Sequence, residues 1–510
     1  AVDGFGNAYV IAVRDSGINN DKDYTVIKYN SEGIEQWDEH YDGTGNGEDI
    51  PHSIAVDESG NVYVTGHSKG TETLLDYATI KYDTDGLLQW VKLYNGTGNG
   101  NDRAKSIAVD ELGNVYVTGE SDGVGTSIDY VTIKYSTDGT EEWVNRFNGA
   151  SNGNDLGYRI AVDTSGNVYA TGSSSSGSGQ DYDFATVKYN SSGDQQWVKV
   201  FDGPASGEDN PFAISVDDAG NVYLAGESEG VGTYTDFTTI KYNTNGDFQW
   251  EHFYNGSGNS SDVASSIALD NEGKVFVTGS TWGISNADYT TIKFNTDGNP
   301  QWVRTYSRTG DSDDFAKSIA VDGTGNVYVT GQSWDSGNEH DYATIKYNSA
   351  GDEKWIQTYN SPVGLSDLAR SIAIDDAGNV YVAGYTAINE NDYDYTTIKY
   401  SSARKPVLIV PGIAGTYAAN VGNDLSWLVE RGTSPENIQA DPLANVYKDL
   451  ISTLENVGYE MNKDLFVVNY DWRLLPAPLD NNFDGFINGL SGTTIADDEF
   501  NYGVDYLGWY

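Results

Sequence analysis

The sequence contains no cysteine, one methionine and five histidines among 510 residues. Without cysteine the chain cannot form disulfide bonds, thiolate metal ligands or a cysteine nucleophile. The missing cysteine does not identify a compartment, because many proteins exported by bacteria also lack it.

Positive charge is scarce as well. The chain has 76 Asp and Glu residues against 29 Lys and Arg residues, which gives a formal net charge of −47. Such a surface repels nucleic-acid phosphates and anionic membranes, so we expect neither as a partner. We predict a solvated acidic surface and no cofactor; Ca²⁺ binding is the alternative explanation for the carboxylates.

Long apolar runs are absent too. No run approaches the roughly 18 residues needed to cross a bilayer, so we expect no transmembrane segment. No signal peptide is recognisable, since residue 1 already lies inside a repeated unit. The only methionine is Met461, so we expect the chain to be a processed product or a fragment.

Glycine (59), tyrosine (37) and tryptophan (12) are abundant instead, which favours β-strands joined by tight turns. Four sequence blocks recur every 52 to 54 residues up to residue 400. They read Ser-Ile-Ala-Val-Asp, Gly-Asn-Val-Tyr-Val-Thr-Gly, Asp-Tyr-x-Thr-Ile-Lys-Tyr, and a fourth block with one Trp. Their marker residues are Asp57, Asp110, Asp163, Asp217, Asp270, Asp322 and Asp375 (Asp3 ends a clipped first copy); Gly66, Gly119, Gly172, Gly226, Gly279, Gly331 and Gly384; Lys28, Lys81, Lys134, Lys188, Lys241, Lys293, Lys346 and Lys399; and Trp37, Trp90, Trp143, Trp197, Trp250, Trp302 and Trp355.

Each block is short, rich in β-branched or aromatic residues and bounded by turn formers, so each predicts a strand. Asp57 to Asn61 predicts a tight hairpin in which Gly60 takes a positive φ. Four antiparallel strands per unit bury both faces of each sheet when the sheets pack radially, which predicts an all-β propeller over residues 1–403. A solenoid is the less favoured alternative. Eight copies of the first three blocks but seven Trp blocks predict eight blades with an incomplete last one, and seven blades remain the alternative.

The stretches Ser53 to Asp57 and Gly60 to Gly66 resemble the bacterial seven-bladed β-propeller repeat family. The resemblance extends over nearly 400 residues. It implies the propeller fold and says very little about a ligand. The number of copies departs from the family name.

An aspartate precedes each first strand, at Asp49, Asp102, Asp155, Asp209, Asp262, Asp314 and Asp367. The stretch Gly98 to Asp102 is similar to the Gly- and Asp-rich nonapeptide loops that bind Ca²⁺. Those loops stack every nine residues and share their ions, whereas in this chain the pattern returns once per unit. We therefore expect these aspartates to order loops by accepting bonds from backbone N–H groups.

Two further repeated features could be mistaken for catalytic groups. Lys81 and its equivalents are predicted to be partners of carboxylates on the surface or between blades, because a residue present in every blade does not mark one active site. The stretches Gly66 to Gly70, Gly119 to Gly123 and Gly226 to Gly230 fit the Gly-x-Ser-x-Gly pattern of a nucleophile elbow. That motif needs a strand-to-helix turn, so we predict that Ser68, Ser121 and Ser228 lie on propeller loops and are not nucleophiles.

Residues 404–510 have a different pattern. The apolar run 407–410 predicts a buried strand, residues 442–457 carry apolar positions at helical spacing, and Gly458 stops that helix. The run 465–470 predicts a second buried strand, followed by Asp471-Trp472-Arg473. Strand, helix and strand in this order predict the first part of an α/β fold.

Two stretches of this region, Val407 to Gly415 and Asn469 to Arg473, resemble the lecithin:cholesterol acyltransferase-like branch of the α/β-hydrolases. The resemblance implies a lipid or other ester substrate. It also implies that the backbone N–H of Ile413 or Ala414 contributes to an oxyanion hole; a simple tight turn is the alternative.

In such enzymes the nucleophilic serine, the acid and the histidine follow later in the chain. Residues 404–510 contain no histidine and no Gly-x-Ser-x-Gly sequence. We therefore expect the coding sequence to continue past Tyr510 with these groups, and the 510-residue chain to be inactive.

These observations leave three hypotheses for function. The first is a fragment of a secreted modular serine hydrolase or acyltransferase, with the propeller as a binding or spacing module. The second is an extracellular or cell-surface adhesion protein whose propeller binds a glycan or a protein. The third is an enzyme with its active site at the centre of the propeller, for which Trp282, Trp334 and His340 are the nearest candidates, too scattered to be assigned a role.

Overall fold

The computed structural model describes residues 1–15, 22–45, 47–177, 181–308, 312–334, 339–389 and 392–401, together with four short strands after residue 406. The chain divides into two compact units, Ala1–Ser402 and Ala403–Tyr510. In the part that the structure describes, no helix is long and apolar enough to span a membrane.

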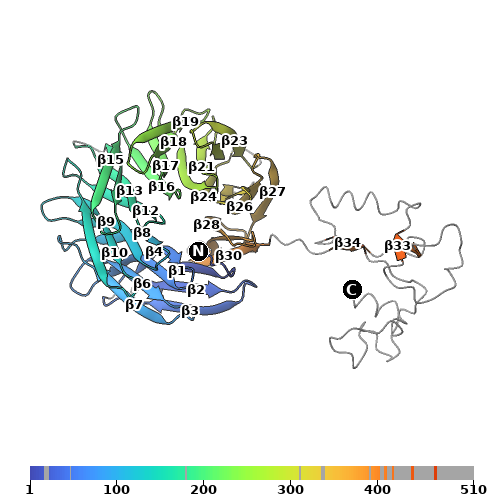
Figure 1. Cartoon of the computed structure of the whole chain (residues 1–510), viewed down its shortest axis with the longest axis horizontal. Coiled ribbons are helices and arrows are strands. Elements are labelled where there is room, and N and C mark those ends of the chain that lie inside the picture. The colour runs from blue at the N-terminus through green and yellow to red at the C-terminus, as the bar shows by residue number, and fades with distance from the viewer. Residues whose placement is uncertain are drawn as a thin grey trace. The chain divides into compact units, whose positions relative to one another are not determined.

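The first unit is a ring of eight antiparallel sheets that follow one another in chain order around a central axis (Figure 1). We call each sheet a blade. Within a blade the strands run in chain order from the centre of the ring outward, as Figure 1 shows for β4 to β7. The prediction of eight blades is confirmed. Six blades have four strands, and the first and last have three among the described residues.

The strands of blades one to four are β1 Ala8–Asp15, β2 Lys22–Tyr29, β3 Glu35–Tyr41; β4 Ile50–Val56, β5 Val62–Lys69, β6 Leu75–Tyr82, β7 Leu88–Tyr94; β8 Asp102–Val109, β9 Val115–Asp122, β10 Ile128–Tyr135, β11 Glu141–Phe147; and β12 Asp155–Val162, β13 Val168–Ser175, β14 Tyr182–Tyr189, β15 Gln195–Phe201. Those of blades five to eight are β16 Asp209–Val216, β17 Val222–Glu229, β18 Thr235–Tyr242, β19 Phe248–Tyr254; β20 Val263–Leu269, β21 Val275–Trp282, β22 Ala287–Phe294, β23 Pro300–Tyr306; β24 Asp314–Val321, β25 Val327–Trp334, β26 His340–Tyr347, β27 Glu353–Tyr359; and β28 Asp367–Ile374, β29 Val380–Asn389, β30 Asp392–Tyr400.

The hairpin between the first two strands of a blade is built by the predicted aspartate. Asp57 accepts the backbone N–H of Asn61 at 2.8 Å, the amide of Asn61 at 2.7 Å and the hydroxyl of Tyr63 at 3.0 Å. Gly60 has a φ of 81°, which side chains disfavour. The repeated Asp, Gly, Asn and Tyr therefore form one turn motif, as the sequence predicts for Asp57 to Asn61.

The hydrophobic cores lie between blades. One core combines Tyr63 and Tyr77 of the second blade with Ile107, Val117 and other residues of the third. Because each blade has two faces, it shares one core with the blade before it and another with the blade after it. Burying an aromatic or aliphatic side chain completely is worth about 1.5–3 kcal/mol, so a blade depends on its neighbours for stability.

Lysine and tryptophan of one blade donate to the same carbonyl oxygen of the next blade. The oxygen of Thr84 accepts from Lys28 Nζ at 2.8 Å and from Trp37 Nε1 at 3.2 Å. The ammonium group also lies over the ring of Tyr9, 5.3 Å from its centroid. The same pair of bonds recurs at the carbonyls of Thr137, Ser191, Thr244, Thr296 and Ser349.

This arrangement corrects one prediction. The repeated lysines do join blades, as expected, but their common partner is a backbone carbonyl and not a carboxylate. Among them, Lys134 also pairs with a carboxylate, that of Glu142, at 2.8 Å. A carbonyl that ends a turn keeps a free lone pair, which the sequence pattern does not reveal.

The contact between the last and first blades uses the same bond from lysine to a backbone carbonyl, but without the tryptophan. Lys399 of the last blade donates to the carbonyl of Ser31 in the first blade at 2.8 Å. The hydroxyl of Tyr381 donates to the carbonyl of Gly6 at 2.9 Å. Since the last blade has no fourth strand among the described residues, no tryptophan of that part supports Lys399 at this interface.

The described part of the second unit consists of four short strands. β31 (Val407–Ile409) pairs in parallel with β34 (Leu465–Val467), and both lie within runs predicted as strands. β32 (Thr416–Ala418) pairs in antiparallel fashion with β33 (Ile438–Ala440). The helix predicted for residues 442–457 and the stretch Asp471 to Arg473 lie outside the described residues.

Closure of the ring gives a testable prediction. Lys399→Met removes the lysine bond from the last blade to the first, and we expect it to lower the free energy of unfolding by about 1–2 kcal/mol. Lys241→Met is the matched control, because Trp250 still donates to the carbonyl of Thr296 at 3.2 Å. Urea unfolding followed by tryptophan fluorescence measures both. Equal losses in the two variants would contradict a special role for Lys399.

Candidate functional site

The inner strand of each of blades two to eight contains a β-bulge at the same position. The pairing register shifts between Ala104 and Ser106 in β8, for example, so Lys105 has no partner on β9. A bulge adds one residue to a strand and redirects its side chain. The bulged residues are His52, Lys105, Tyr158, Phe212, Ser265, Lys317 and Arg370.

A repeated glycine makes the bulge fit. Gly119 lies opposite the bulge on β9, and a Cβ atom there would sit 2.1 Å from the carbonyl oxygen of Arg103. The six equivalent glycines meet the inner strand equally closely, at 1.8–2.1 Å. The last glycine of each Gly-Asn-Val-Tyr-Val-Thr-Gly block is therefore required by close approach of two backbones.

Bulged residues of neighbouring blades contact or influence one another around the axis. The rings of Tyr158 and Phe212 stack with centroids 6.4 Å apart. Burial lowers the pKa of His52, and the charge of Lys105 in the next blade lowers it further. Burial also lowers the pKa of Lys317, and the charge of Arg370 in the next blade lowers it further. The bulges thus form one ring of side chains on the innermost strands. It carries cations on blades three, seven and eight, and aromatic rings on blades four and five.

His52 and His67 form a pair within the second blade. His52 Nε2 lies 3.0 Å from His67 Nδ1. The pKa of His52 is lowered to about 4, first by burial and then by the charge of Lys105. The pKa of His67 is lowered to about 3, first by burial and then by His52. Both imidazoles are therefore neutral near pH 7, and one donates a hydrogen bond to the other.

The inner strands of blades two to eight carry five Lys and Arg residues and five aspartates, although the protein as a whole is strongly acidic. Their only acidic residue is the aspartate that starts five of them, and that aspartate is buried. Lys105 and Arg103 pair with Glu120 at 3.0 and 3.8 Å. The remaining basic side chains are those of Arg159, Lys317 and Arg370, and no carboxylate of the described residues lies within 4 Å of them.

Polar groups complete the ring on the aromatic side. Ser173 donates to the amide oxygen of Asn210 at 2.7 Å, and the amide nitrogen of Asn210 lies 3.3 Å from Glu227. Burial raises the pKa of Glu227, while bonds from Asn210 and Thr235 oppose that effect. The ring as a whole offers cations, flat apolar surfaces and a small polar network, a combination suited to binding an organic anion.

The aspartates before each inner strand order loops, as predicted. Asp102 accepts the backbone N–H of Gly96 at 2.8 Å, and the six equivalents accept the corresponding N–H at 2.5–2.8 Å. Among the described residues, two groups of three carboxylates are close enough to hold a cation, with ligand atoms within 4.8 Å: Asp23, Asp42 and Asp49, and Asp183, Asp202 and Asp209. Both oxygens of Asp49 and of Asp209 already accept backbone bonds.

The residues singled out as catalytic candidates have different outcomes. Ile413 and Ala414 lie outside the described residues, so their role in an oxyanion hole stays a prediction. Ser68, Ser121 and Ser228 lie on the strands β5, β9 and β17, not on loops, and are at most 2% exposed. Such burial agrees with the expectation that these serines are not nucleophiles.

Trp334 and His340 are direct neighbours and not scattered. They face each other across β25 and β26, with ring centroids 4.5 Å apart. Trp282 occupies the position equivalent to Trp334 in the sixth blade and pairs with Ala287. The pairing register of the strands explains why Trp334 lies opposite His340 and Trp282 opposite Ala287. These two contacts give no evidence of a catalytic role.

The ring of bulged residues was not predicted from the sequence. A signal for it exists in the repeats: the position before the Ser-Ile-Ala block holds His, Lys, Tyr, Phe, Ser, Lys and Arg in turn, directly after a position that holds only Pro, Ala or Gly. A position that varies inside an otherwise repeated strand marks a side chain that the fold does not constrain.

Comparison with known families confirms both sequence resemblances. The beta-propeller repeat family matches residues 41–72, 89–125, 142–179, 301–337 and 365–390. The lecithin:cholesterol acyltransferase family matches residues 434–490, a range that includes Asn469 to Arg473 but not Val407 to Gly415. The chain is therefore modular, with a propeller followed by a segment similar to part of that second family.

Several solved structures match the chain at low identity. A eukaryotic initiation factor is 10% identical with a TM-score of 0.40, covering 77% of this chain and 88% of its own. The β-propeller domain of the Trilobed protease from Pyrococcus furiosus, described as having an open velcro topology, is 10% identical with a TM-score of 0.40, covering 71% and 97%. The extracellular domain of a one-component system from B. thetaiotaomicron is 12% identical with a TM-score of 0.31, covering 80% and 55%. Among curated proteins, none matches the sequence significantly.

The close approach at the bulges gives one prediction. Gly119→Ala places a methyl group against the carbonyl of Arg103, and we expect a loss of about 3 kcal/mol in the free energy of unfolding. Gly323→Ala is the control, because nothing lies within 4 Å of a Cβ atom there. Thermal and urea unfolding compare the two. A neutral Gly119→Ala variant would show that the bulge does not need glycine.

The carboxylate cluster of Asp183, Asp202 and Asp209 gives a second prediction. Burial raises the pKa of Asp183 to about 6, and the negative charges of Asp202 and Asp209 act in the same direction. The folded state then binds this proton more tightly than the unfolded chain, so its stabilising effect is complete below about pH 4 and is lost as pH rises through 6. We expect the free energy of unfolding to fall between pH 5 and pH 7.

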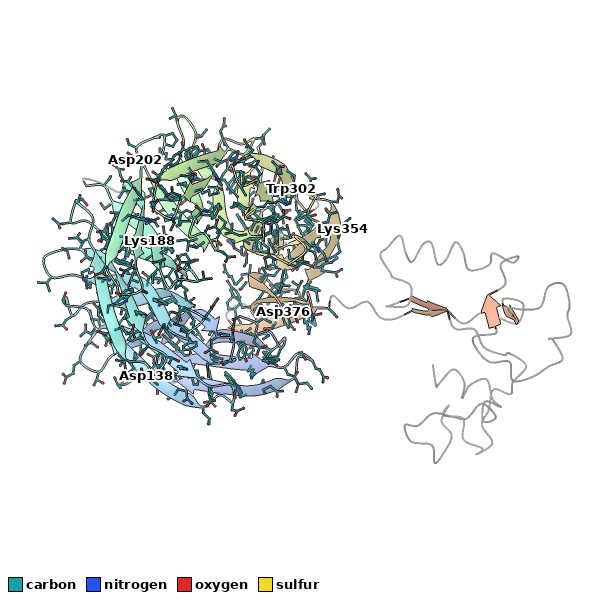
Figure 2. All side chains as sticks on the ribbon, in the orientation of Figure 1. Asp138, Lys188, Asp202, Trp302, Lys354 and Asp376 are labelled. Carbon is teal, nitrogen blue, oxygen red and sulfur yellow. The ribbon has the colours of Figure 1, made fainter. Side chains whose placement is uncertain are left out.

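Asp202→Asn removes one repelling carboxylate and should reduce this fall by about 1 kcal/mol. Asp138→Asn is the control. Hydrogen bonds, of which the one from Ser136 has the largest effect, lower the pKa of Asp138 to about 2, so this carboxylate does not titrate between pH 5 and pH 7. Figure 2 labels both Asp202 and Asp138. Urea unfolding at pH 5 and pH 7 provides the measurement, and a fall that is unchanged by Asp202→Asn would refute the role of this cluster.

Proposed function

We propose that the chain is part of a secreted, modular serine hydrolase or acyltransferase in which the propeller serves as a binding or spacing module. The single observation that supports this proposal is the match of residues 434–490 to the lecithin:cholesterol acyltransferase family, on the same chain as the propeller repeats. The substrate would be a lipid or another ester, and the protein would act outside the cell or at its surface.

The chemistry requires groups that the 510-residue chain does not supply. Ester hydrolysis in this class needs a serine nucleophile, a histidine base bonded to it, and N–H donors for the oxyanion. Ile413 or Ala414 would provide one donor. Residues 404–510 hold no histidine, and all five histidines belong to the propeller repeats. The parallel pairing of β31 with β34 agrees with the start of an α/β sheet.

A second candidate is an interaction protein whose propeller is itself the functional part. The ring of bulged residues favours it, because its side chains differ from blade to blade although the framework of the blade repeats. The two candidates differ in one respect: only the first requires a reactive serine in the complete protein.

Reactivity with a fluorophosphonate tests the proposal. The 510-residue chain should show no labelled serine and no hydrolysis of short-chain aryl esters above background, since its elbow-like serines are buried on strands. The proposal requires further residues after Tyr510, and a protein that includes them should be labelled at one serine there and should hydrolyse the ester.

The absence of labelling in the longer protein would reject the hydrolase and favour the interaction protein. Labelling of Ser68, Ser121 or Ser228 would instead place the reactive group in the propeller. Mass spectrometry of the labelled peptides distinguishes these outcomes.

A further inference from the structure

Two cations occupy equivalent positions on the inner strands of the seventh and eighth blades, which pack against each other. They are the bulged residues Lys317 on β24 and Arg370 on β28. Each is bordered by an aromatic ring: Lys317 Nζ lies 5.4 Å from the centroid of Phe315, and the guanidinium of Arg370 lies 5.0 Å from that of Tyr385. Arg370 also donates to the hydroxyl of Tyr385 at 2.6 Å.

No carboxylate oxygen of the described residues lies within 4 Å of either cation. The ion pairs among the described residues include neither side chain. Burial lowers the pKa of Lys317, and the positive charge of Arg370 lowers it further, so the two charges repel each other. Within a protein of 76 acidic residues, two adjacent cations without a carboxylate are unusual.

Both side chains of the pair are accessible to solvent. Arg370 is exposed and Lys317 is half-buried, although both belong to the innermost strands of the ring (Figure 1). His340 is the neighbouring titratable group; its pKa is lowered by burial, and Asp313, Glu339 and Lys317 also act on it. It is therefore neutral near pH 7 and adds no third positive charge to the pair.

We propose that Lys317 and Arg370 bind the carboxylate of a small sugar acid whose apolar face contacts the rings of Phe315 and Tyr385. A guanidinium binds a carboxylate through two parallel hydrogen bonds, and an ammonium adds a third, charge-assisted one. Flat aromatic surfaces beside the cations suit the C–H face of a sugar ring. This binding site depends on neither the hydrolase chemistry nor the segment after residue 403.

The charge of the protein favours a compact ligand with few negative charges. A net charge of −47 repels a long polyanion before it reaches the inner strands, whereas a single carboxylate meets two local cations at small cost. Inorganic phosphate carries the charge but no apolar face, so it would use the cations and leave both rings uncovered.

Calorimetric titration of the 510-residue chain at low ionic strength tests the site. Glucuronate is the probe, and glucose is its uncharged match. We expect glucuronate to bind at least tenfold more tightly than glucose, and Lys317→Gln or Arg370→Gln to weaken it about tenfold or more. Lys317→Arg keeps the charge and should retain binding within about threefold.

Lys354→Gln is the control for the change in net charge. Lys354 is exposed on β27, at the outer edge of the seventh blade (Figure 2), and its replacement should leave binding unchanged. Thermal melts of every variant establish that the ring is folded, and loss of binding in folded Lys317→Gln with retention in Lys317→Arg supports the site.

Three results would overturn the proposal. The first is equal binding of glucose and glucuronate, which removes the role of the carboxylate. The second is unchanged binding in a double Lys317→Gln, Arg370→Gln variant, which places the ligand elsewhere. The third is displacement of glucuronate by inorganic phosphate at equal concentration, which removes the role of the aromatic rings.

Discussion

The propeller depends on a backbone carbonyl that accepts from two side chains of the preceding blade. At Thr84 the donors are Lys28 and Trp37, and five further interfaces repeat this pair of bonds. The indole also packs beneath the turn of the next blade, where a Cβ atom on Gly86 would lie 2.9 Å from Trp37. One interaction thus determines the lysine, the tryptophan and the turn glycine of the repeat, which explains why these three persist together.

Much of the fold could be predicted from local rules. The hairpin from Asp57 to Asn61, the strand blocks and their number follow from turn chemistry and repetition. The partner of the repeated lysine could not, because a carbonyl on the next blade is 56 residues away in sequence and has no residue type of its own. Attraction to carboxylates was the reasonable expectation in so acidic a chain, and geometry decided otherwise.

The candidate site was hidden for a related reason. A β-bulge changes the register of one strand against another, and a single strand of sequence such as Ala104-Lys105-Ser106 shows no trace of it. The glycine that permits the bulge lies on the neighbouring strand, where it reads as an ordinary strand end. Combining both positions across seven repeats was necessary to recognise the ring, whereas Ile413 and Ala414 rested on family resemblance alone.

Closure of the ring also brings the two ends of the propeller together. Tyr381 bonds to Gly6, so nearly 400 residues of polypeptide return to the blade in which they began. Segments joined before the first blade and after the last therefore start close together, however many blades lie between them. Gain or loss of a whole repeat would change the diameter of the ring but hardly the distance between its first and last strands. Adding blades would therefore widen the propeller without moving the segments attached to its two ends further apart.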